Sequence, residues 1–165
     1  MQLRTSHIKH FLSTHPKSHT IKTIEVCAIN ELPIHCPLSA RPALFVINTD
    51  PNFKQGAHWV LVHLPKNTKA HAPHFFDPLG HPPSFYGPRF PRFLRNNTEN
   101  NMMYTFNGSK VQSDSSTACG FFCCFYAISV MLDKDLCIDI VQFMKERPER
   151  ELIRFVLLQC NDITT

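Results

Sequence analysis

Short apolar runs alternate with polar, proline-containing segments through the first two thirds of the chain. Runs of this length and β-branched content predict strands, and a continuously apolar run predicts a strand buried on both faces. The expected strands lie at 21–28, 43–48, 58–64, 73–77 and 102–106, with Val111 in a further short one. The first of these we expect at a sheet edge.

Helical periodicity marks both ends of the chain. Residues 5–14 place Ile8, Phe11 and Leu12 on one face, Thr5 or Ser6 can cap this helix, and Pro16 ends it. Further helices are predicted at 89–95, 119–132, 135–144 and 148–160. The 119–132 run is almost entirely apolar, as expected for a helix buried on all sides.

Mixed strands around a buried helix predict an α+β fold, and 165 residues fit one domain spanning 1–165. The composition is globular, with 43% hydrophobic and 18% charged residues. The formal net charge of +4 allows weak contact with nucleic acid, but no dense basic cluster is present. No apolar stretch is long enough to predict a membrane span, and we expect a monomer.

Cysteine and histidine usage argues against a disulfide framework and against a metal site. Seven cysteines is an odd number, and the polar N-terminus predicts no signal peptide, so we expect free thiols in a reducing compartment and no secretion. The sequons at Asn96 and Asn107 then carry no meaning. There are ten histidines but no Cys-x-x-Cys pair, and His71 and His74 lack a partner pair at zinc-finger spacing.

The segment 111–124 carries the clearest chemical signal. Cys119 is followed by Gly120 at the start of the apolar helix, and Gln112 lies seven residues upstream. A helix N-terminus offers unpaired N–H groups and a positive dipole end, which favour a thiolate nucleophile. An amide side chain such as that of Gln112 can stabilise an oxyanion. Free cysteines usually just pack in a core, as we expect for Cys123 and Cys124.

Two upstream motifs supply a base and a group to orient it. His58 stands in Gly-Ala-His-Trp, and Asp77 stands in Phe-Phe-Asp-Pro-Leu-Gly. Taken singly, His58 reads equally well as an ordinary strand histidine and Asp77 as a turn residue before Pro78. Their order with Gln112 and Cys119 favours a cysteine peptidase. Trp59 is predicted to wall the substrate cleft beside the base.

These three motifs resemble the adenain-like cysteine proteases of adenoviruses, over about residues 5 to 160. The run Phe-Val-Ile-Asn-Thr-Asp-Pro looks most like the proteases of Maverick/Polinton elements and adintoviruses. The resemblance implies a papain-like, adenain-like fold: a sheet packed on a central helix that begins at the nucleophile. It implies the triad His58, Asp77 and Cys119, with Gln112 as oxyanion-hole donor.

The resemblance also implies an endopeptidase that cuts capsid or other virion precursors after glycine-containing sites, within virions and the host nucleus or cytoplasm. Asn101 stands where the adenovirus enzyme has the cysteine that binds its activating peptide. We therefore expect no cofactor, and the residues do not support activation by a peptide or by DNA.

Two alternatives stay open at this stage. One is an isopeptidase of the same clan that acts on SUMO or ubiquitin-like proteins. Those enzymes typically place the glutamine one residue closer to an Asp-Cys-Gly motif, whereas Ala118 precedes the cysteine here. The other is a domesticated, non-catalytic copy that serves as a binding module, against which the four intact site residues argue.

Overall fold

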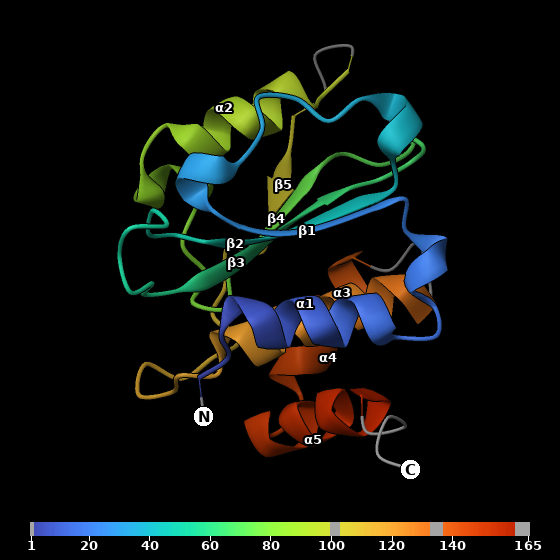
Figure 1. The fold of residues 1–165 in the computed structure, drawn as a ribbon. Helices are drawn as coiled ribbons and strands as arrows, with labels where there is room; N and C mark the ends of the chain where they lie inside the picture. The colour runs from blue at the N-terminus through green and yellow to red at the C-terminus, as the bar shows by residue number, and fades with distance from the viewer. Residues whose placement is uncertain (1, 100–102, 133–136, 161–165) are drawn as a thin grey trace.

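Five strands form one mixed sheet whose spatial order follows the chain, β1-β2-β3-β4-β5 (Figure 1). The computed structural model describes residues 2–99, 103–132 and 137–160. The β1/β2 and β4/β5 pairs are parallel, and the two pairs between them are antiparallel. The strands are β1 (Thr23–Ala28), β2 (Ala43–Asn48), β3 (Trp59–Leu64), β4 (His74–Phe76) and β5 (Thr105–Phe106).

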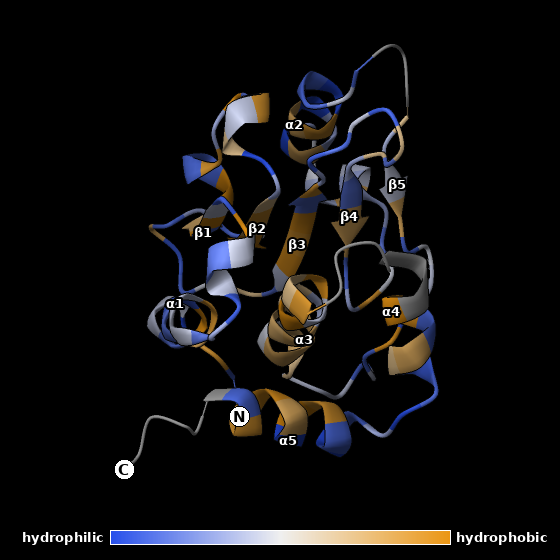
Figure 2. Ribbon diagram, turned by 90° about the vertical axis from the view of Figure 1, so that its right-hand side faces the viewer, coloured by the Kyte–Doolittle hydropathy of each residue, from blue (hydrophilic) through white to orange (hydrophobic). Residues whose placement is uncertain are grey.

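Helices cover both faces of the sheet. The α-helices are α1 (Thr5–Thr14), α2 (Arg89–Asn96), α3 (Cys119–Leu132), α4 (Cys137–Lys145) and α5 (Glu149–Cys160), with short 3-10 helices η1 (Ser18–Thr20), η2 (Ile29–Glu31), η3 (Leu38–Ala40) and η4 (Pro83–Tyr86). α2 lies over one face, and α1 and α3 lie under the other. α5 packs beneath α3, so α3 forms a layer between the sheet and α5 (Figures 1 and 2).

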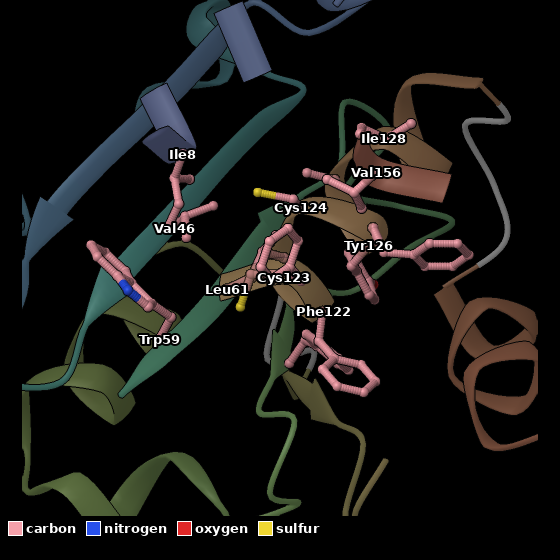
Figure 3. Packing of buried hydrophobic residues seen from close by; sticks show 14 of the residues in the cluster. Ile8, Val46, Trp59, Leu61, Phe122, Cys123, Cys124, Tyr126, Ile128 and Val156 are labelled. Carbon is pink, nitrogen blue, oxygen red and sulfur yellow. The ribbon is translucent and has the colours of Figure 1, made fainter. Parts of the chain in front are cut away.

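Alternation along β2 separates the two cores. Leu44 and Val46 face the core that contains α1, α3 and α5, whereas Phe45 and Ile47 face the core that contains α2. The continuous apolar sequence of β2 therefore follows from burial on both faces. Figure 3 shows side chains of the first core, among them Val46 of β2, Cys124 of α3 and Val156 of α5.

The α+β prediction, with a mixed sheet and a central helix beginning at Cys119, is confirmed. The prediction of a strand at Val111 is wrong, because its N–H donates to Pro78 O at 2.9 Å in a loop contact. Arg4, not Thr5 or Ser6, is the N-cap of α1. The first residue of the predicted strand 102–106 and residues 135 and 136 of the predicted helix 135–144 lie outside the described residues.

A tight turn after β4 fits against the loop that leads to Cys119. Gly80 N–H donates to Asp77 O at 2.8 Å, and Gly80 has a φ of +77°. A β-carbon added at Gly80 would lie 2.6 Å from the backbone nitrogen of Lys110 and from the carbonyl carbon of Ser109. The backbone at Gly80 therefore packs directly on the backbone of Ser109 and Lys110. Glycine is required there both by the positive φ and by the lack of room for a β-carbon.

We predict that Gly80→Ala destabilises the protein more than Gly108→Ala. Both glycines have positive φ, +77° and +54°, which costs an alanine about 1–2 kcal/mol. Only Gly80 also meets neighbouring backbone, because a β-carbon at Gly108 would make an ordinary contact with the Phe106 ring at 3.6 Å. The overlap adds about 1–3 kcal/mol. Urea unfolding of both variants measures the difference, and equal losses would contradict the packing of this turn.

Candidate active site

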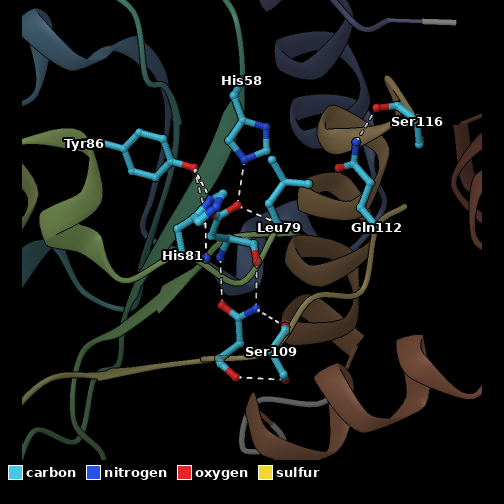
Figure 4. Close-up of polar contacts among 9 residues, drawn as sticks. His58, Leu79, His81, Tyr86, Ser109, Gln112 and Ser116 are labelled. Carbon is cyan, nitrogen blue, oxygen red and sulfur yellow. Dashed lines mark hydrogen bonds and ion pairs between the residues drawn. The ribbon is translucent and has the colours of Figure 1, made fainter. Parts of the chain in front are cut away.

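The antiparallel pairing of β3 and β4 brings His58 and Asp77 together. His58 immediately precedes β3 and Asp77 immediately follows β4, so both lie at the same end of the sheet. His58 Nε2 lies 2.7 Å from Asp77 Oδ1 (Figure 4). His58 is 8% exposed and Asp77 is fully buried. The distance and the burial make this a strong, directional contact.

Cys119 completes the group from the other layer. It begins α3, and the preceding residue closes the first turn, since Ala118 O accepts the N–H groups of Phe121 and Phe122. The Cys119 side chain lies close enough to the imidazole of His58 to help raise its pKa. Because His58 Nε2 contacts Asp77, Nδ1 is the imidazole nitrogen left to face the sulfur. The early N–H groups of a helix have no carbonyl partner within it, so Cys119 N–H can bind an anion.

Three donors besides His58 hold the carboxylate of Asp77. Leu79 N–H donates to Oδ1 at 2.8 Å, while His81 N–H and the Tyr86 hydroxyl donate to Oδ2 at 3.2 and 2.7 Å. Burial works to raise the pKa of Asp77, but the contact with His58 and the bonds from Tyr86 and Leu79 together lower it. Burial and the bond to Asp77 raise the pKa of Tyr86, so its hydroxyl remains a donor.

Asn107 holds the backbone of Asp77 from the β5 side. Its Oδ1 accepts Asp77 N–H at 2.9 Å, and its Nδ2 donates to Asp77 O at 2.7 Å and to Ser109 O at 2.9 Å. Sequence reasoning dismissed Asn107 as a chance sequon and missed Tyr86 altogether. A lone asparagine after a short strand gives no signal, because its use depends on pairing between β4 and β5.

The imidazole of His58 is held in its charged form. Burial alone would lower its pKa, but hydrogen bonds to Asp77 and Cys119 and the negative charges of both outweigh this and raise the pKa to about 9. His58 is therefore protonated at neutral pH. A cation beside the sulfur favours the thiolate form of a cysteine.

Gln112 lies across the site from His58, on the loop that leads into α3 (Figure 4). Its side-chain Nε2 donates to Ser116 O at 2.7 Å, and the residue is 3% exposed. An amide nitrogen carries two protons, so this bond leaves one for an oxyanion. The structure thus places His58, Asp77, Cys119 and Gln112 at one end of the sheet and the adjoining start of α3.

Trp59 has a different environment from the one predicted. It is 3% exposed and belongs to the apolar core, and its indole N–H donates to Leu3 O at 3.1 Å (Figure 3). The indole binds the N-terminal segment to β3 and does not form an open cleft wall. A contact between Trp59 and substrate remains a prediction, and steric selection near the cut must be argued from other residues.

A buried thiol, an imidazolium and an orienting carboxylate, with a helix N-terminus for the oxyanion, are the groups that catalysis by a cysteine protease needs. Comparison with known families gives the same class. The model of the family described as adenovirus endoprotease matches residues 37–161, which is more than half of the chain. The chain belongs to this family, whose members are cysteine endopeptidases. None of the curated proteins matches the chain.

Three further expectations from the sequence concern an activating peptide, a metal ion and a membrane span. Asn101, where the sequence lacks the cysteine for an activating peptide, lies outside the described residues. Within the described ranges, no three His, Cys, Asp or Glu side chains gather in a way that would hold a metal ion. The helices in those ranges are too short or too polar to cross a bilayer.

We predict that Cys119 is alkylated faster than the other described thiols. Burial, followed by the charges of Glu25 and Glu31, raises the pKa of Cys27 to about 12, and burial raises the pKa of Cys123 well above its usual value. Iodoacetamide labelling at pH 7 with peptide mapping measures the order, and His58→Ala should slow the labelling of Cys119 alone. Faster labelling of Cys27 or Cys123 would refute the assignment.

We also predict a loss of stability in mild alkali. A group whose pKa is raised on folding, as for His58, stabilises the fold fully below its unfolded pKa of about 6.5. That contribution is lost as the pH rises through about 9. The thermal midpoint should therefore fall between pH 7 and pH 9.5 in the natural protein and in the exposed control His10→Ala. His58→Ala should show a flatter profile; an equally steep one would exclude His58 as the cause.

Proposed function

We propose that this protein is a maturation protease that cleaves capsid or other virion precursors through the triad His58, Asp77 and Cys119. The observation that carries the proposal is the His58 imidazole, held by Asp77 Oδ1 at 2.7 Å and close enough to Cys119 for that side chain to help raise its pKa. Membership in the adenovirus endoprotease family supports the viral setting.

The reaction begins when the Cys119 thiolate attacks the scissile carbonyl carbon and forms a C–S bond. The carbonyl electron pair moves to oxygen, and the oxyanion is bound by Cys119 N–H and Gln112 Nε2. Protonated His58 then gives its proton to the leaving amine as the C–N bond breaks. Asp77 keeps the imidazole oriented and stabilises its charge.

The second half of the reaction releases the acyl group. Neutral His58 takes a proton from water, the hydroxide oxygen attacks the thioester carbon, and the C–S bond breaks to return the thiolate. Tyr86 and the loop after Asp77 hold the carboxylate in place throughout, because three donors besides His58 leave it little freedom to turn.

Access to the nucleophile supports a preference for glycine before the cut. Cys119 is 3% exposed and His58 is 8% exposed, so a substrate backbone must come close to reach the sulfur. Glycine, which lacks a side chain, makes such an approach without overlap. We infer extended substrates with an apolar-x-Gly-x or apolar-x-Gly-Gly pattern, as the family resemblance suggests.

The same proposal covers setting and partners. The protein acts as a monomer in virions and in the host nucleus or cytoplasm, on polypeptides of a virus or of a Maverick/Polinton element. Its net charge of +4 supports weak contact with nucleic acid near a packaged genome. Genes for a capsid protein and a packaging ATPase beside this one would support the viral or Polinton origin.

A peptide library tests the substrate. We expect rapid cleavage of unstructured peptides with the apolar-x-Gly-x or apolar-x-Gly-Gly pattern and no cleavage by Cys119→Ala. SUMO and ubiquitin fusions run in parallel, because an isopeptidase draws most of its binding energy from the folded body. Rapid cutting of a fusion without cutting of its isolated tail peptide would overturn the virion-protease proposal in favour of the isopeptidase.

A further inference from the structure

Ser116 lies three residues before the nucleophile, and its carbonyl oxygen and hydroxyl together make three hydrogen bonds outside its own turn. Its carbonyl oxygen accepts from Gln112 Nε2 at 2.7 Å, as drawn in Figure 4. Its hydroxyl accepts from Ala118 N–H at 3.0 Å and donates to Glu149 Oε1 at 2.7 Å. One residue thus joins the amide of Gln112, the start of α3 and the start of α5.

The direction of the hydroxyl bonds is fixed by chemistry. A backbone N–H can only donate, so Ser116 Oγ accepts from Ala118 N–H. The hydroxyl proton of Ser116 is then donated in a hydrogen bond to the Glu149 carboxylate. A hydrogen bond to a charged acceptor is stronger than a neutral one. Glu149 is the first residue of α5 and is half-buried, and a carboxylate there is favoured by the helix dipole. Glu149 therefore holds the Ser116 hydroxyl in one position.

The orientation of the Gln112 side-chain amide depends on the position of Ser116. Among the described residues its Oε1 is buried and has no hydrogen-bond partner, so the bond from Nε2 to Ser116 O is what sets the rotation of the amide. The backbone of the loop is also held, since Ser116 N–H donates to Ser113 O at 3.1 Å and Gln112 N–H donates to Pro78 O at 3.0 Å. No side chain of the loop adds to this at the Gln112 amide, because Ser113, Asp114, Ser115 and Thr117 are exposed. A shift of Ser116 would turn the second Nε2 proton away from the oxyanion.

We propose that Ser116 and Glu149 are positioning residues for the oxyanion hole, through which α5 controls the geometry of Gln112. The inference rests on the proposed role of Gln112 as oxyanion donor. α5 packs on α3 beneath the sheet, so the docking of this helix and the catalytic geometry are linked through one hydroxyl.

Kinetics of single variants give the first test. Ser116→Ala and Glu149→Ala should each lower kcat about tenfold with little change in KM, because misplacing a catalytic group affects the transition state more than ground-state binding. Glu149→Gln should recover most of the rate, since its amide oxygen still accepts. Ser115→Ala and Glu151→Gln are matched controls, both exposed and outside this network, and should retain full activity.

A double-mutant cycle separates positioning from general loosening. Gln112→Ala alone should lower kcat by about 10²–10³. The double variant Gln112→Ala/Glu149→Ala should have a kcat less than about twofold below that of Gln112→Ala, because the amide that Glu149 positions is already absent. A full additional tenfold loss would assign Glu149 a merely structural role and overturn the inference.

The same data distinguish the two failures. If Gln112→Ala loses the expected factor of about 10²–10³ in kcat while Ser116→Ala and Glu149→Ala keep a normal kcat, only the positioning role is refuted. If Gln112→Ala lowers kcat by less than tenfold, Gln112 is not the oxyanion donor of the proposed function, and this inference fails with it.

A spectroscopic measurement does not depend on turnover. In ¹H–¹⁵N spectra the side-chain amide signals of Gln112 should move in Glu149→Ala and stay in place in Glu151→Ala. Unmoved signals in a folded Glu149→Ala protein would overturn the inference. If Ser116→Ala fails to fold, Glu149→Gln and Glu149→Ala still provide the comparison.

Discussion

The buried charge of Asp77 is the constraint on which the site depends. A carboxylate without solvent costs several kcal/mol unless donors surround it. Here the donors come from its own turn, from η4 and from the residue before β3. The tight turn at Gly80, the place of Tyr86 and the bridge through Asn107 can all be understood as parts of the cage that this charge requires.

That cage explains why the acid and the base lie on neighbouring antiparallel strands. An imidazole opposite a caged carboxylate has few orientations open to it, and Asp77 holds Nε2 of His58. The raised pKa of His58 then follows from two negative groups on opposite sides of one ring. The nucleophile need only approach the free nitrogen, which the packing of α3 under the sheet ensures.

Much of this arrangement could be predicted from the sequence, and the reasons are physical. The almost entirely apolar run 119–132 is long enough to predict a buried helix, and short, β-branched apolar runs such as 43–48 predict interior strands. The four site residues could be recognised because their order and motifs are distinctive. Tyr86, Asn107 and Ser116 could not, since their roles arise from loops that meet only after the sheet has formed. Trp59 follows His58 in the sequence, but its indole is buried in the core that contains α1 and α3, which the sequence motif did not indicate; its contact with substrate stays a prediction.

Gly120 has a consequence beyond the helix that it helps to start. A β-carbon there would lie 2.9 Å from Leu3 Cβ, and Leu3 O also accepts the indole N–H of Trp59. Leu3 is therefore a spacer between the residue after Cys119 and the residue after His58. The N-terminal segment thus joins the first and last thirds of the polypeptide directly beside the candidate site.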